Sequence, residues 1–81
     1  MDPWLTDATA RLAESVGDDT SAYALSGADI EILLELAGVA AHDSGARTNA
    51  PLVAYLVGLA AGRHADRSLP ALASAARTPG S

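Results

Sequence analysis

The apolar and polar positions of the chain alternate with a helical period in its first segment. Between residues 3 and 16, apolar side chains recur every three or four positions, as on one face of an α-helix. Asp2 precedes this segment as an expected N-cap, Pro3 suits its first turn, and Gly17 marks its end. We call the apolar residues of this face the N-terminal stripe: Trp4, Leu5, Ala8, Leu12 and Val16.

A second, more apolar helix is predicted over residues 27–44. Ser26 and Asp29 have the spacing of a capping box, and Gly45 is an expected C-terminal stop. Apolar residues cover most of this segment, so only a few acidic side chains are left for water. The preceding link, residues 18–26, shows no long periodicity and is predicted to be a loop.

A third helix is predicted over residues 50–65 and a short fourth over 69–77, with Ser68 as its cap. From Ala50 to Gly62 the third segment has no charged side chain. Its length of roughly 20 Å is too short for a hydrocarbon layer of about 30 Å, so we expect no membrane span. Residues 78–81 are expected to form a disordered tail.

These segments predict an all-α fold, a small bundle of three long helices plus the short fourth one. With 81 residues the chain has room for a single helical domain, which we place at residues 1–77. Its core has to be built from Leu, Ile, Val and Ala, because the chain has one tryptophan, two tyrosines and no phenylalanine.

Small residues recur every fourth position in both central helices, at Ala37, Ala41 and Gly45 and at Ala54, Gly58 and Gly62. We call the second row the small-residue ridge. We expect the two rows to meet in a tight helical hairpin, which would turn leucines 52, 56 and 59 toward the rest of the core.

Four further apolar residues are the ones that a three-helix bundle has least room to cover: Ile32, Leu36, Val53 and Val57. Several such side chains left in water would be unusual for a monomer. We therefore expect the protein to be a homodimer, or to dock on a partner protein, through these four side chains.

Net charge is unevenly distributed along the chain. Residues 1–45 carry −8 and residues 46–81 carry +3, within a total of −5. This balance disfavours nucleic-acid binding, which depends on basic side chains. The chain has no cysteine and no basic, apolar leader at its start, so we expect a cytoplasmic protein.

Few residues of the chain are candidates for binding a ligand or for catalysis. His42, Arg47, Arg63 and His64 are the candidates for binding a small anion or a nucleotide, which is the alternative function that the residues allow. Cations also sit well at helix C-termini without any ligand. No nucleophile motif, phosphate loop or set of metal ligands is recognisable. We expect no catalytic residue, no metal site and no cofactor, and no catalysis by this chain alone.

Three stretches together carry a resemblance: "WL" near the start, "ADIEILLELAGVAAH" and "NAPLVAYLVGLAAGR", within residues 4–64. The chain resembles a small bacterial domain of unknown function, found alone or joined to molybdenum-cofactor guanylyltransferase-like nucleotidyltransferases. The resemblance implies an accessory role in molybdenum-cofactor biosynthesis. It also singles out residues 42–51 as the candidate functional surface. We therefore expect a non-catalytic accessory module that assists such an enzyme through homodimerisation or partner docking.

Overall fold

The structure is a computed structural model, and it describes residues 2–77. It confirms the all-α fold class: four α-helices and one short 3₁₀ helix follow one another along these residues. Their bounds are α1 Pro3–Val16, η1 Thr20–Tyr23, α2 Gly27–Ser44, α3 Asn49–Arg63 and α4 Leu69–Ala76. The expected disordered tail, residues 78–81, lies outside the described residues.

Local capping explains where most helices begin and end. Asp2 accepts a hydrogen bond from the backbone of Trp4 at 2.7 Å, which starts α1. Ser26 and Asp29 form the reciprocal capping box that starts α2, with bonds of 3.0 and 3.1 Å. Gly17 and Gly45 end α1 and α2 with φ of 77° and 72°, a conformation that favours glycine.

Two segments differ from the sequence prediction. The link at 18–26, expected to be a loop, contains η1, because the carboxylate of Asp19 accepts the backbone N–H of Ser21 and caps a short turn. Helix α3 begins at Asn49 and ends at Arg63, two residues before the predicted end, where His64 leaves the helical conformation.

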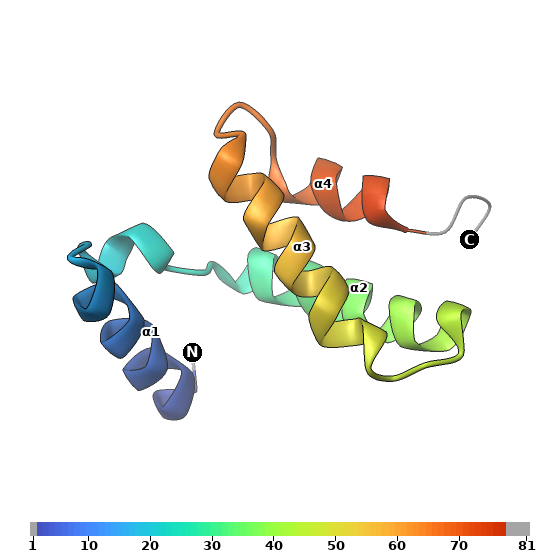
Figure 1. Ribbon diagram of the computed structural model, residues 1–81, viewed down its shortest axis with the longest axis horizontal. Coiled ribbons are helices and arrows are strands. Elements are labelled where there is room, and N and C mark those ends of the chain that lie inside the picture. The colour runs from blue at the N-terminus through green and yellow to red at the C-terminus, as the bar shows by residue number, and fades with distance from the viewer. Residues whose placement is uncertain (1, 78–81) are drawn as a thin grey trace.

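The core lies between α2, α3 and α4, each of which contacts the other two. Leu36, Val57 and Ala73 are its buried centre, and Ile32, Val53, Leu69 and Leu72 pack against them. We call residues 27–76 the bundle. The preceding part, residues 3–23, is called the arm: among the described elements α1 contacts only η1, and its one buried residue is Ala13. Figure 1 shows α1, in blue, standing apart from the three later helices.

The predicted contact residues are therefore placed differently by the structure. Leu36 and Val57 are only 2% and 4% exposed, and Ile32 and Val53 pack on them. The prediction left these side chains uncovered because it did not foresee that the short α4 lies across α2 and α3 at this point. Leu36 and Val57 are thus part of the buried core, and Ile32 and Val53 are partly buried against it.

The expectation for the small-residue ridge was also wrong. A Cβ atom added at Gly58 or Gly62 would meet nothing within 4 Å, so no backbone approaches α3 closely at these glycines. The same is true of Gly45, in the opposing row of α2. Valines 53 and 57 face α2 in place of the ridge, and the ridge instead borders an open groove.

Candidate interaction surface

One side of α3 exposes four large apolar side chains. Leu52, Tyr55, Leu56 and Leu59 are 60%, 67%, 59% and 45% exposed. Their spacing places them on one side of the helix, and we call them the α3 face. Leucines 52, 56 and 59 were expected to face the core, so α3 is turned about its axis relative to the prediction.

Helix α3 is apolar all round. Val53 and Val57 point into the core, the ridge lies on a second side, and the α3 face lies on the third. Its first charged side chain, Arg63, stands at its last position. Helices of this kind are normally buried on every side, whereas α3 is covered only where α2 and α4 touch it.

An apolar groove of about 480 Å³ runs beside the α3 face. The ridge residues Ala54, Gly58 and Gly62 form one wall, and Leu33 of α2 and Leu25 of the link before it contribute to the others. Two titratable residues line the groove, Asp29 and Tyr23. The Asp29 carboxylate accepts from Ser26 within the capping box, and the Tyr23 hydroxyl donates to Asp18. The lining therefore suits apolar side chains better than a charged ligand.

The N-terminal stripe is the second uncovered apolar surface. Trp4, Leu12 and Val16 are 71%, 54% and 56% exposed, while Leu5 and Ala8 are half-buried. The stripe is open because α1 packs only on η1, through a side of the helix that buries Ala13. Two exposed apolar surfaces of similar length, one on α1 and one on α3, are thus unpartnered in the described chain.

Short-range polar bonds give the arm its shape. The Asp19 carboxylate accepts the backbone N–H of Ser21 at 2.9 Å and its hydroxyl at 2.8 Å, and these bonds lower the pKa of Asp19 below 3.8. The Tyr23 hydroxyl donates to the carboxylate of Asp18, which raises the pKa of Tyr23 above 10.0. These bonds order η1 and the turn that precedes it, and α1 packs on η1.

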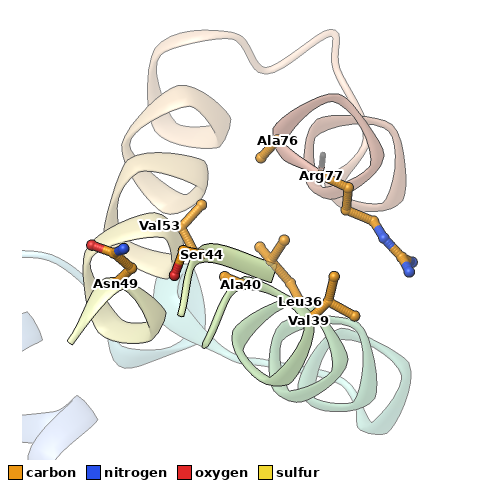
Figure 2. A pocket seen from close by; sticks show the side chains of 8 residues that line it. All are labelled: Leu36, Val39, Ala40, Ser44, Asn49, Val53, Ala76 and Arg77. Atoms are coloured by element: carbon orange, nitrogen blue, oxygen red, sulfur yellow. The ribbon is translucent and has the colours of Figure 1, made fainter. Parts of the chain in front are cut away.

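A smaller pocket of about 190 Å³ opens between α2, α3 and α4 (Figure 2). Its polar groups are Ser44, Asn49 and Arg77, and Figure 2 shows the last two on opposite sides. Arg77 forms an ion pair with Glu35 at 3.3 Å, and the Ser44 hydroxyl bonds the backbone of Ala46. Polar groups do not converge in this pocket, so it offers no evident anchor for a ligand.

The four candidate anion-binding residues lie at opposite ends of α3. His42 and Arg47 flank the turn that precedes α3, whereas Arg63 and His64 stand at its end. A helix of this length separates them by about 20 Å. The exposed His42 ring pairs with its neighbour Asp43 at 3.2 Å. Within residues 2–77, no cluster of three histidine or acidic side chains has the arrangement of a metal site.

The signal for the α3 face was present in the sequence but was assigned to the wrong side. The absence of charge between Ala50 and Gly62 indicated a helix that needs cover on all sides. It could not indicate which side the bundle itself covers, since valine and leucine fit a core equally well. Among the helices described here, none is both long and apolar enough to span a membrane.

The comparison with protein families identifies the chain. It belongs to the family described as a domain of unknown function (DUF6457), whose model matches residues 1–79. Comparisons with curated proteins and with solved structures gave no match. The family assignment supports the resemblance to a domain of unknown function.

Proposed function

We propose that this chain is a non-catalytic interaction module, which assembles through the α3 face and then assists a molybdenum-cofactor nucleotidyltransferase. The observation that carries the proposal is the exposure of four large apolar side chains on one side of α3. Exposed patches of this kind commonly mark protein contact sites. Leu56 lies near the middle of the patch, so it is the side chain whose change should matter most.

The polar side chains do not converge on one site, which supports a binding role over a catalytic one. Catalytic groups have to converge on one place within hydrogen-bond reach of a substrate. Here the two histidines lie at opposite ends of α3, and the imidazole of His42 is exposed beside Asp43. The large apolar surface is by contrast continuous, because the α3 face and the groove share one helix.

The class of enzyme in the proposal comes from the sequence resemblance. The stretches at 28–42 and 49–63 that carry it form most of α2 and all of α3. Part of the resemblance therefore lies on the helix that carries the exposed face. An accessory domain works by binding beside an enzyme that supplies the chemistry, which fits a surface with large apolar side chains and few convergent polar groups.

Isothermal titration calorimetry of a molybdenum-cofactor guanylyltransferase with the full chain tests this proposal. We expect binding by the wild-type chain, and its loss in Leu56→Lys, which places a charge within the α3 face. Leu34→Lys is the matched control, because Leu34 is 68% exposed on α2 and lies outside the face. Absence of binding heat with the wild-type chain, or equal binding by both variants, would contradict the proposal.

A further inference from the structure

The chain exposes more surface than a compact protein of its mass. A compact protein of 8.1 kDa exposes about 4,500 Å², whereas this chain exposes 5836 Å². Its radius of gyration is 13.4 Å, against about 11.7 Å for a compact domain of this length. The excess of roughly 1,300 Å² exceeds the ~800 Å² that each partner buries in a standard interface.

Two of the exposed apolar surfaces match each other. The N-terminal stripe runs along α1, of 14 residues, and the α3 face along α3, of 15 residues. Each offers leucines together with one large aromatic side chain, Trp4 on α1 and Tyr55 on α3. Packing one helix on the other would bury both surfaces at once, with the groove receiving the larger side chains.

Charge favours this pairing over a pairing of two α3 helices. Helix α1 carries Asp7 and Glu14 against a single arginine, Arg11, while Arg47 and Arg63 stand at the two ends of α3. The net charge of α1 is therefore −1, so an α1 laid along α3 brings no excess of like charge to these two arginines. Two antiparallel α3 helices would instead bring Arg63 of each copy toward Arg47 of the other, where like charges repel.

Helix α1 projects away from the bundle of its own chain. Helix α1 rests on η1, and the hydrogen bonds of Asp19 and Tyr23 order η1 and the turn between the two elements. Only residues 24–26 join this unit to α2. A unit that projects from its own bundle presents its stripe to another molecule, as in proteins that exchange an identical element.

We propose that α1 of one copy covers the α3 face and the adjoining groove of a second copy, and that the second copy does the same in return. The result is an arm-exchanged homodimer with two equivalent contacts. This inference rests on the proposed function, because it names what fills the α3 face when the module assembles.

Disulfide trapping tests the exchange, since the chain has no cysteine of its own. Leu12→Cys protein is mixed with Leu52→Cys, Leu56→Cys or Leu59→Cys protein and oxidised. We expect a disulfide between the two different variants in at least one mixture, in excess over the yield with the matched control Leu34→Cys. Equal yields in all mixtures would overturn the exchange.

The double variant Leu12→Cys/Leu56→Cys distinguishes a second copy from closure of the arm on its own bundle. Exchange predicts disulfide-linked dimers of the double variant. An internally bonded monomer would overturn exchange. The emission of Trp4, the one tryptophan, supplies an independent measurement: exchange predicts a blue shift as the protein concentration rises.

Lysine variants separate a failure of exchange from a failure of the proposed function. Exchange predicts that Leu12→Lys and Leu56→Lys both dissociate the dimer, whereas Ala10→Lys, on the exposed side of α1 away from the stripe, does not. A dimer lost in Leu56→Lys but intact in Leu12→Lys would overturn exchange and leave the α3 face as the contact surface. A wild-type chain that neither dimerises nor binds the enzyme would overturn both.

Discussion

The arm and the bundle are built on different physical principles. In the bundle, side chains far apart in the sequence bury one another, with Leu36, Val57 and Ala73 at the centre. In the arm, the bonds that fix its shape join residues at most five positions apart, such as Tyr23 to Asp18, and one small residue, Ala13, is buried. The bundle is thus stabilised by its own core, while the arm has local order and an uncovered apolar stripe.

This difference indicates what each region contributes. A segment with local bonds and few buried contacts belongs to the low-stability end of a protein and is suited to binding another surface. A buried core supplies a scaffold that keeps the α3 face in a fixed position. The comparison therefore assigns stability to the bundle, and it supports the proposal that the arm and α3 form the contacts with a second copy.

The largest expected effect is a difference between two leucine-to-alanine substitutions. Leu36→Ala in the bundle should lower the free energy of unfolding by about 3 kcal/mol, because it opens a cavity at a residue that is 2% exposed. Leu12→Ala in the arm should lower it by less than about 1 kcal/mol in the monomer, since that side chain is half exposed.

Urea unfolding followed by far-UV circular dichroism measures both changes. The substitutions are best made in the Leu56→Lys background, in which the proposed dimer cannot form and both variants are compared as monomers. Equal losses of stability in the two variants would break the distinction between a packed bundle and a locally ordered arm.

A smaller effect is expected from glycine substitutions within the bundle. Gly45→Ala should cost about 1–2 kcal/mol, because φ at this residue is +72° and alanine is strained there. Gly38→Ala, inside α2 where an added Cβ meets nothing within 4 Å, should stabilise the protein by about 0.5–1 kcal/mol. We expect the melting temperature to fall in Gly45→Ala and to rise in Gly38→Ala. A rise in both variants would contradict the left-handed conformation of Gly45.

The smallest effect concerns the pH dependence of the arm. The lowered pKa of Asp19 stabilises the folded arm at pH above the ordinary value of 3.8, and this contribution is lost as pH falls through the folded pKa. The raised pKa of Tyr23 stabilises it below pH 10.0, and that contribution is lost as pH rises through the folded pKa. Both groups are exposed, so the effects should be small.

Two-dimensional NMR of the backbone amides measures these transitions residue by residue. The amide of Ser21 should shift at acid pH and resonances around Tyr23 at alkaline pH, while amides near Val57 in the bundle stay unchanged. In Tyr23→Phe the alkaline transition at η1 should disappear. Transitions of the same size in arm and bundle would show that the two regions are not distinct in this respect.

Helices were predictable from the sequence, but their packing was not. Caps such as Ser26 with Asp29 and stops such as Gly17 and Gly45 act on neighbouring residues, so their effect is visible in the sequence. Which side of α3 faces the core depends on α4, a distant segment. Because no charged residue lies between Ala50 and Gly62, the sequence does not indicate which side of α3 faces water. The prediction therefore placed Leu52, Leu56 and Leu59 in the core and left Val53 and Val57 uncovered, which is the reverse of the observed arrangement.

Interaction sites follow the same logic. The sequence indicated that α2 and α3 carry more apolar surface than a small bundle covers, and the exposed side chains of α3 agree with that general expectation. The sequence also suggested one anion-binding site made of His42, Arg47, Arg63 and His64. The length of α3 keeps His42 and Arg47 apart from Arg63 and His64. The N-terminal stripe is exposed because α1 packs on η1 and not on the bundle. No residue pattern within α1 predicts this packing.

Sedimentation equilibrium at tens of micromolar tests most directly the central claim that the α3 face is a contact surface between two copies of the chain. We expect a mass of twice 8.1 kDa for the wild-type chain and for Leu34→Lys, and of 8.1 kDa for Leu56→Lys. A wild-type mass of 8.1 kDa, equal to that of Leu56→Lys at every concentration, would overturn this claim.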